Sequence, residues 1–310
     1  MENATLEISP MSTCSMYSEL LQGLQPFWIA YFVIAINVVL IITAILGNVL
    51  ILIALQDSLL HSPSKMLFRC LTSTDLCVGL ITQPCFVTYL ISEISGLLSV
   101  CYVTERLVHI SSAILCGISL GTLTGISVDR LLALQLGLRY RQIVTLTHVR
   151  GIAILSWVLF SSLSMLYFWN PYCFMVTFCT IILLFLVAST LCYSKIYFTL
   201  RSRQTQVCQQ SEPGEPNLLA RGRMFKYKKS VTSSTWVYLT LIVCYLPFAI
   251  VQIVRGDIYG KSLSIILAEG STISLVYLNS SINPAIYCWR IKEIRQAVKR
   301  TIRHFCFFCY

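Results

Sequence analysis

The chain has 310 residues, of which 56% are hydrophobic and only 12% are charged. Ordinary soluble proteins carry about 25% charged residues, so this composition excludes a soluble domain and favours an integral membrane protein. The formal net charge is +10, and its meaning depends on where the Lys and Arg residues lie along the chain.

Seven apolar stretches are long enough to cross a bilayer, for which a helix needs about 20 mostly apolar residues. They lie at about 27–55, 66–92, 100–134, 150–169, 175–200, 232–254 and 263–289. We therefore predict an all-α membrane protein with a seven-transmembrane helix bundle. Because the number of spans is odd, the two termini lie on opposite sides of the membrane.

The basic residues predict the orientation of the bundle. If the loops after spans one, three and five and the C-terminal tail are cytoplasmic, only Arg106, Arg255 and Lys261 lie outside, which leaves 20 of the 23 Lys and Arg residues inside. This distribution follows the positive-inside rule and places the N-terminus outside. The positive charge is thus a signal of topology, with some attraction to anionic lipid, and gives no reason to invoke a nucleic-acid partner.

This topology divides the chain into an extracellular segment 1–26, a membrane domain 27–289 and a cytoplasmic tail 290–310. The first segment lacks the basic start and apolar core of a cleaved signal peptide, so we expect span one to insert directly. Asn3-Ala4-Thr5 is a glycosylation sequon, and it predicts a glycan on Asn3.

Polar side chains recur at a similar depth in four spans. A carboxylate at mid-membrane costs at least a few kcal/mol unless it is paired, protonated or hydrated, so Asp75 in span two is a candidate functional residue. Oxygen-bearing side chains at matching depth suit a small hard cation; they belong to Asn48, Ser119, Asn279, Ser280 and Asn283. The alternative is a neutral Asp75 that is hydrogen-bonded to Asn48 alone.

Span seven also contains a helix breaker, Pro284. A transmembrane helix tolerates proline only where neighbouring groups satisfy the carbonyl that the missing N–H leaves free. We therefore expect this helix to pack inside the bundle.

Short motifs occur in order along all seven spans. They are Gly47-Asn48-Val49, Leu71 to Asp75, Asp129-Arg130, Trp157, Tyr193, Cys244-Tyr245-Leu246-Pro247 and Asn283-Pro284-Ala285-Ile286-Tyr287. Over roughly residues 27–305 this set resembles the rhodopsin-like (class A) G-protein-coupled receptors. The resemblance implies a receptor in the plasma membrane that binds an extracellular ligand and activates a heterotrimeric G protein.

The resemblance also implies roles for individual residues. Asp75, Ser119, Asn279, Ser280 and Asn283 resemble the family's sodium pocket, which Asn48 braces. Arg130 is similar to the arginine that leaves Asp129 on activation to meet the G protein. Tyr193 and Tyr287 resemble the tyrosines that swing inward to hold the open state, and Pro247 is expected to kink span six. Sodium as an allosteric ion is the only cofactor expected.

The chain departs from the family pattern at several positions. Leu131 replaces the usual tyrosine after the arginine, and Tyr245 replaces the usual tryptophan before the span-six proline, so altered basal activity is expected. Span five has no proline, and the loop from about Asn170 to Phe174 is short, as in melanocortin, cannabinoid and lysophospholipid receptors. Glu105 stands where the family has its span-three disulfide cysteine. One bridge among Cys14, Cys101 and Cys173 is expected, with all three pairings open.

The ligand is the least constrained feature. Glu105 and His109 lie one turn apart near the outer end of span three, and Glu269 lies near the top of span seven. The deeper polar candidates are Ser112, Gln252, Tyr245 and Tyr277. We predict a small peptide or another cationic ligand that contacts Glu105 and Glu269, with a neutral lipid or nucleoside as the alternative. Pairing of Glu105 with a neighbouring basic group explains its presence equally well.

The tail after Tyr287 carries apolar residues at helical spacing between basic ones. Ile291, Ile294, Val298, Ile302 and Phe305 predict an amphipathic helix on the inner leaflet. Cys306 and Cys309 follow and are candidate palmitoylation sites.

Two other classes of protein are less consistent with the sequence. The four histidines are divided between the two faces, so no catalytic or metal cluster is apparent and an enzyme is not expected. An ion-coupled transporter that uses Asp75 is the alternative to a receptor. Such transporters commonly show paired inverted halves, and none is evident here.

Overall fold

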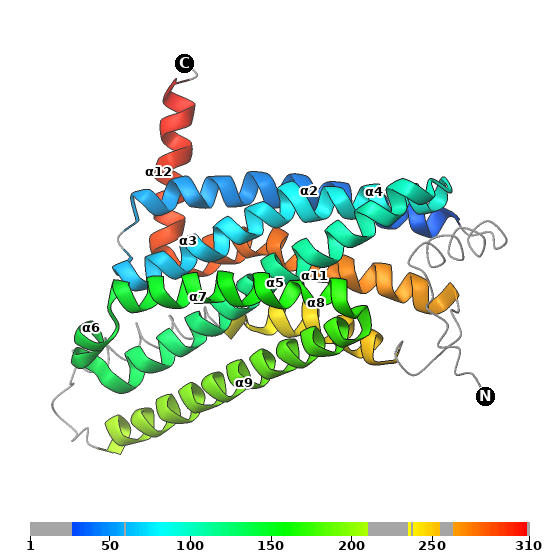
Figure 1. Cartoon of the computed structure of the whole chain (residues 1–310). Coiled ribbons are helices and arrows are strands. Elements are labelled where there is room, and N and C mark those ends of the chain that lie inside the picture. Colours follow the sequence, from blue (N-terminus) through cyan, green and yellow to red (C-terminus); the bar gives the residue numbers. More distant parts are fainter. Residues whose placement is uncertain (1–26, 59, 210–234, 237, 255–262, 309–310) are drawn as a thin grey trace, which may run out of the picture.

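The computed structural model describes residues 27–58, 60–209, 235–236, 238–254 and 263–308. Its elements are α2 (Phe27–Gln56), α3 (Ser62–Cys77), the π-turn η1 (Val78–Thr82), α4 (Gln83–Ile94), α5 (Leu98–Leu136), η2 (Gly137–Arg139), α6 (Tyr140–Ile143), α7 (Leu146–Ser164), α8 (Leu166–Trp169), α9 (Pro171–Gln209), α11 (Leu263–Arg290) and α12 (Lys292–Phe308), with a further helix at Tyr238–Val254. The described part of the chain is an all-helical bundle (Figure 1).

Within these ranges, five helices are long and apolar enough to cross a membrane: Trp28–Gln56, Ser62–Ile94, Leu98–Leu136, Leu146–Trp169 and Pro171–Ser202. The apolar helix Tyr238–Val254 is shorter. Helix α11 has 28 residues, and Glu269 and the asparagines lower its hydropathy. These seven helices lie where the sequence predicts the seven spans.

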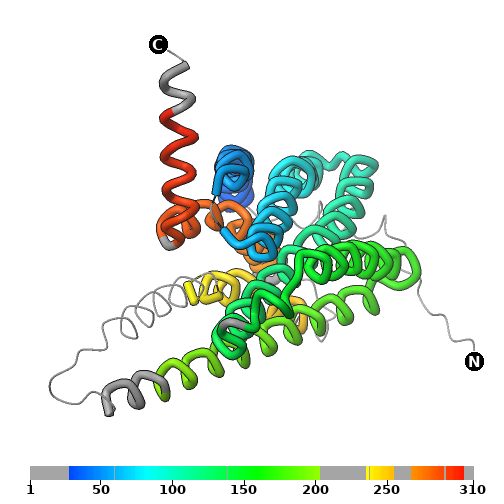
Figure 2. The backbone as a smooth tube through the Cα atoms, turned by 90° about the vertical axis from the view of Figure 1, so that its left-hand side faces the viewer, coloured from blue at the N-terminus to red at the C-terminus, as the bar shows by residue number. Residues whose placement is uncertain are grey.

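Helix α5 forms the centre of the bundle and packs against α3, α4, α7 and α9 (Figures 1 and 2). Its buried face joins the main hydrophobic core through residues such as Leu120 and Leu123. The second span consists of α3 and α4, which are joined by the π-turn just before Pro84. Proline cannot donate the usual helical hydrogen bond, and a π-turn is one of the ways in which a helix accommodates that loss.

The extracellular connection between α8 and α9 is shorter than predicted. Helix α8 ends at Trp169 and α9 begins at Pro171, so the expected loop of about five residues is reduced to Asn170. The Asn170 side-chain oxygen accepts hydrogen bonds from the backbone N–H groups of Tyr172 and Cys173 at 2.9 and 3.1 Å. Asparagine before the helix and proline at its first position are favourable N-terminal residues, which explains the earlier start.

At the cytoplasmic end, α12 lies across the bundle and extends beyond α2 (Figures 1 and 2). Ile294 and Ala297 are fully buried in the core that α2 also forms, whereas Ile302 is exposed. Arg300 donates to the backbone oxygen of Asp57 at 3.3 Å. The predicted amphipathic helix is therefore present, but its first turns use the apolar face to pack on α2 rather than to face lipid alone.

Candidate functional site

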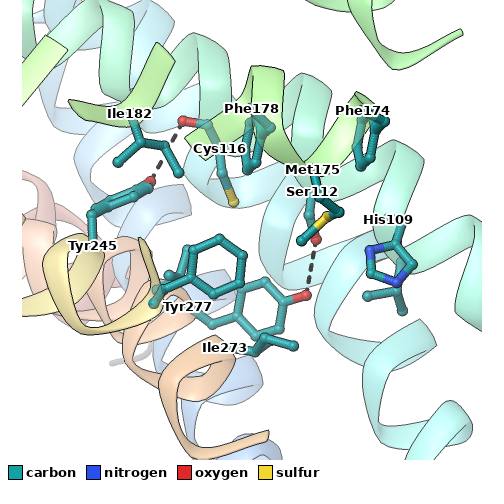
Figure 3. A pocket seen from close by; sticks show the side chains of 13 residues that line it. His109, Ser112, Cys116, Phe174, Met175, Phe178, Ile182, Tyr245, Ile273 and Tyr277 are labelled. Carbon is teal, nitrogen blue, oxygen red and sulfur yellow. Dashed lines mark hydrogen bonds between the residues drawn. The ribbon is translucent and has the colours of Figure 1, made fainter. Parts of the chain in front are cut away.

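Two adjoining cavities lie in the outer half of the bundle. The inner cavity of about 40 Å³ is mostly apolar, and Figure 3 shows the side chains that line it. Its lining comprises Val108, His109, Ser112, Cys116, Phe174, Met175, Phe178, Ile182, Tyr245, Phe248, Ile273, Val276 and Tyr277. Three spans that are distant in the sequence, α5, α9 and α11, thus meet the helix Tyr238–Val254 around one cavity.

Two tyrosines close the inner cavity toward the membrane centre. The hydroxyl groups of Ser112 and Tyr277 are hydrogen-bonded at 3.0 Å, which links α5 to α11 across the cavity (Figure 3). Tyr245 donates to the backbone oxygen of Cys116 at 3.5 Å. Both tyrosine side chains are almost fully buried. The predicted residues Ser112, Tyr245 and Tyr277 therefore do lie together in this cavity.

The outer cavity, of about 50 Å³, contains three carboxylates. It is lined by Phe86, Tyr89, Leu90, Glu93, Glu105, Val108, His109, Glu269, Gly270 and Ile273. It shares Val108, His109 and Ile273 with the inner cavity, so the two are neighbours. Glu105, His109 and Glu269, which the sequence singled out, meet here. Gln252 lines neither cavity, but its Nε2 donates to Glu269 Oε1 at 3.3 Å.

Aromatic rings surround His109 at the junction of the two cavities. Its ring stacks on Tyr167 with centroids 5.2 Å apart and meets Phe174 edge-on at 6.5 Å. On the α4 side, Tyr89 donates to Glu93 at 3.2 Å and its ring stacks on Phe86. Sequence reasoning missed these aromatic residues because apolar side chains in a span give no signal that separates cavity-facing from lipid-facing positions.

A second polar site lies deeper, around Asp75. The carboxylate is fully buried and accepts hydrogen bonds from Ser119 at 3.2 Å, Ser280 at 2.8 Å and Asn283 Nδ2 at 2.8 Å. Three predicted partners are thus in place. The alternative in which Asp75 bonds to Asn48 alone is wrong, because Asn48 makes no hydrogen bond to Asp75 among the contacts described.

Asn48 instead donates a hydrogen bond to a backbone carbonyl of α11. Pro284 lies inside this helix and leaves the Ser280 carbonyl without its usual donor. Asn48 Nδ2 donates to that carbonyl at 3.0 Å. A side chain added at Gly47 would come within 2.9 Å of the Pro284 ring, so α2 and α11 approach closely here. The expectation that a neighbouring helix would satisfy the freed carbonyl is confirmed.

Asn279, the remaining predicted member of the Asp75 site, is fully buried but makes no hydrogen bond to Asp75. Among the described residues, both polar atoms of its side chain lack a hydrogen-bond partner, as do the side-chain oxygens of Asn48 and Asn283. Buried polar atoms are almost always satisfied by protein, water or an ion. The region around Asp75 therefore retains several oxygen atoms that can coordinate a cation.

The third polar site is at the cytoplasmic end of α5. We expected Asp129 to pair with Arg130, but within the described residues its carboxylate accepts from Ser64 at 3.0 Å and from the Tyr140 hydroxyl, and no ion pair joins it to Arg130. Burial, followed by the hydrogen bond to Asp129, raises the pKa of Tyr140 to about 12, so the phenol remains a donor. Tyr140 was missed because it lies in the loop helix α6, outside the family motif.

The other predicted residues of this face lie apart. Tyr287 is fully buried and packs edge-on against Phe68 at 5.2 Å, with no hydrogen-bond partner for its hydroxyl. Tyr193 stacks on Tyr238 at 4.8 Å. Pro247 lies within the helix Tyr238–Val254. The inward movement of the two tyrosines remains a prediction.

The cysteine pairing is partly decided. Cys101 is disulfide-bonded, whereas Cys173 is free and exposed, so the two pairings that involve Cys173 are excluded. The partner of Cys101 lies outside the described residues. The glycosylation candidate Asn3 and the palmitoylation candidate Cys309 also lie outside them, and the side chain of Cys306 is not described.

Comparison with known proteins supports the family that the motifs predict. Residues 47–173 match the sequence model of the family described as "7 transmembrane receptor (rhodopsin family)". The chain is also similar to adenosine receptor A2a from Homo sapiens (26% identity), Canis lupus familiaris (26%) and Cavia porcellus (25%), over 87% of this chain and 72% of each relative. Together these matches support a class A receptor of the rhodopsin family, as the motifs along the chain predict.

The same matches support the general activity. This rhodopsin-family receptor is a multi-pass plasma-membrane protein that binds an extracellular ligand and signals through a heterotrimeric G protein. The matched family consists of receptors, so the enzyme and transporter alternatives are not supported. The two outer cavities and the Asp129 site lie toward opposite ends of the bundle.

Proposed function

We propose that this receptor recognises a small peptide or another cationic ligand that also carries an apolar or aromatic group. The observation that carries the proposal is the pair of adjoining cavities, of which one is acidic and the other mostly apolar. A ligand with both chemical features can occupy both cavities at once.

The outer cavity supports the cationic part. Carboxylates of Glu93, Glu105 and Glu269 come from three different helices and line a single space. Phe86, Tyr89 and His109 stand beside them, and aromatic faces attract cations in addition to the carboxylates. Binding of a positively charged group offsets the repulsion between acids that the bundle brings together.

The inner cavity supports the apolar part. Phe174, Met175 and Phe178 from α9 form one wall, and Ile273 and Val276 from α11 form another. The hydroxyl groups of Ser112 and Tyr277 offer one polar contact at its floor. Such a site, mostly apolar with a few fixed polar groups, is typical of small-molecule pockets.

The test begins with a screen of cationic peptides, amines, nucleosides and neutral lipids against cells that express the receptor, read out by G-protein biosensors of every class. For an active cationic compound, the double variant Glu105→Gln, Glu269→Gln should lower potency about tenfold or more, because two charge-assisted contacts are lost. Glu293→Gln, an exposed carboxylate in α12, is the matched control. Unchanged potency in the double variant would contradict the cationic ligand and leave the receptor assignment intact.

A nucleoside is the second candidate. It is favoured by the likeness to proteins named adenosine receptor A2a, at 26% identity over 87% of this chain. The inner cavity supports it through Ser112, Tyr277 and His109, which offer hydrogen-bonding groups beside aromatic rings. A nucleoside agonist whose potency falls with Ser112→Ala and not with Glu105→Gln would favour this candidate over the cation.

We also propose that sodium binds beside Asp75 and stabilises the inactive state. A fully buried carboxylate is costly without a compensating charge or proton, and within the described residues Asp75 has only neutral hydrogen-bond donors. The unpartnered oxygens of Asn48, Asn279 and Asn283 supply further oxygen ligands of the kind that hard cations prefer. The residues therefore fit the ion. Asp75 and Ser119 would hold it, together with Asn279, Ser280 and Asn283.

A third proposal concerns the membrane itself. Exposed basic residues of α12, including Arg295, Lys299 and Arg303, lie on the helix that crosses the cytoplasmic end of the bundle. This arrangement supports an attraction between α12 and anionic lipid of the inner leaflet.

A further inference from the structure

The cytoplasmic end of span six carries two aromatic side chains that contact different neighbouring helices. Trp236 and Tyr238 are two residues apart in the sequence, and two positions on an α-helix differ by about 200°. Their side chains therefore project from opposite sides of the span. In Figure 2 this span, coloured yellow, lies between α9 and α11 at the end of the bundle that faces the viewer.

Tyr238 joins span six to α9 in two ways. Its ring stacks on Tyr193 with centroids 4.8 Å apart and an interplanar angle of 26°. Its hydroxyl is hydrogen-bonded to that of Thr190. Thr190 also donates its own proton to the Leu186 carbonyl at 2.7 Å, so Tyr238 is the donor in the contact between the two helices.

The surroundings of Tyr193 form a small hydrophobic cluster separate from the main core. Leu134, Tyr193 and Ile196 are buried in it, with Leu131, Leu200 and Tyr238 packed against them. Leu131 is the residue that replaces the usual tyrosine after Arg130. Among the described residues of span six, Tyr238 is the one in this cluster, and it carries the contact with α9 described above.

Trp236 joins span six to α11 on the other side. Its ring lies 5.8 Å from that of Trp289 at an interplanar angle of 55°. Both indoles are partly exposed, by 42% and 59%, so the contact lies at the outer surface of the two helices. Such a contact is separate from the packing of the bundle core.

We propose that Tyr238 and Trp236 are positioning residues that hold the cytoplasmic end of span six between α9 and α11 in the absence of ligand. Outward movement of span six separates Tyr238 from Thr190 and Tyr193, and Trp236 from Trp289. Tyr193 then loses its stacking partner and becomes able to turn into the space that opens. The two contacts thus set the basal level of G-protein activation in this receptor.

The test measures ligand-independent receptor activity in cells at matched surface levels. An aromatic contact of this kind is strong enough to shift a two-state equilibrium about two- to tenfold. Tyr238→Leu and Trp236→Leu should each raise basal activity by that factor. Tyr238→Phe and Thr190→Val should have smaller effects that are not additive, because both remove the same hydrogen bond.

Tyr197→Leu is the matched control, because Tyr197 lies on α9, is 60% exposed and packs on the adjacent Phe198 of the same helix. Amide hydrogen exchange of the purified receptor gives a second readout that does not depend on coupling to a particular G protein. Peptides that cover Trp236 to Leu241 should exchange faster in both leucine variants than in the control. Exchange and basal activity that match the control in both variants would overturn the proposal.

Discussion

At the cytoplasmic end of α5, the hydrogen bonds of Asp129 differ from those that its motif predicts. Its carboxylate is bound by Ser64 and Tyr140 rather than by the adjacent Arg130, whose buried Nε has no hydrogen-bond partner. Within the described residues, Asp129 therefore does not hold Arg130 by the ion pair that the motif alone predicts. We therefore expect Tyr140, from α6, to influence Arg130 through Asp129.

Tyr140→Phe should lower receptor signalling. The variant removes one hydrogen-bond donor from Asp129 without changing the shape of the aromatic ring. An ion pair between the Asp129 carboxylate and Arg130 then becomes more favourable. Loss of a hydrogen bond to a charged group corresponds to a fall of about tenfold in the active population. Basal or agonist-driven G-protein activation at equal surface levels measures this change.

Two companion variants make that result interpretable. Tyr172→Phe, at an exposed tyrosine on the extracellular end of α9, should leave signalling unchanged. Arg130→Ala should abolish signalling with either residue at position 140, because the effect acts through the arginine. Equal or higher signalling in Tyr140→Phe would show that the hydrogen bond to Asp129 does not release Arg130.

Asp75→Asn tests the proposed sodium site. The variant keeps the size of the side chain and removes the negative charge that attracts the ion. Basal activity and agonist affinity should then become insensitive to replacement of sodium by a large organic cation, because a ligand shifts a conformational equilibrium only through its differential affinity. A mutant that keeps the wild-type response to sodium would place the ion elsewhere or rule it out.

At the scale of the helices, close packing of α5 and α7 depends on the absence of a side chain at Gly117. A Cβ atom there would lie 2.4 Å from the Phe160 ring, whereas at Gly121 the nearest atom is 3.6 Å away, at the end of Phe185. Phe160 is itself 3% exposed and packs on Phe185 at 6.3 Å, so the ring has little freedom to move. The two helices therefore make their close contact at this glycine, as is common between transmembrane helices.

Gly117→Ala should destabilise the receptor by about 1–3 kcal/mol, the usual range for overpacking a core. The measurement is the apparent melting temperature of purified receptor at one fixed scan rate, because unfolding of such proteins is generally irreversible. Gly151→Ala in α7, where no atom lies within 4 Å of the added Cβ, is the control and should be neutral or slightly stabilising. If Gly117→Ala has the same apparent melting temperature as the control, the proposed close contact is unimportant for stability. The same conclusion follows if adding Phe160→Leu to Gly117→Ala does not restore the melting temperature.

At the scale of the whole molecule, the extracellular and cytoplasmic ends are built differently. The hairpin of α8 and α9 turns at Asn170 alone, on the side of the bundle where the two outer cavities lie. At the other end, α12 packs on α2 through Ile294 and Ala297 while its basic residues face outward. The two outer cavities and the Asp129 site thus lie toward opposite ends of one bundle, and α5 contributes residues to both.

The sequence by itself determined the number, order and orientation of the spans, because hydropathy and charge are summed along short stretches of chain. It also determined that Pro284 needs a donor from another helix and that Ser119, Ser280 and Asn283 belong with Asp75. These inferences succeed because each depends on depth in the membrane, which residue spacing along a helix reports directly. Sodium binding, glycosylation of Asn3 and palmitoylation of Cys306 and Cys309 stay predictions.

Only the tertiary structure decided which side chains meet across the helices. Asp129 accepts hydrogen bonds from Ser64 and Tyr140. Asn48 donates to the carbonyl freed by Pro284, and Tyr238 stacks on Tyr193. Each of these contacts depends on how two helices are rotated and how closely they approach. In lipid, unlike water, an apolar stripe does not mark the buried face of a helix, so periodicity gives little information on rotation. The packing of small and large residues such as Gly117 and Phe160 decides it instead.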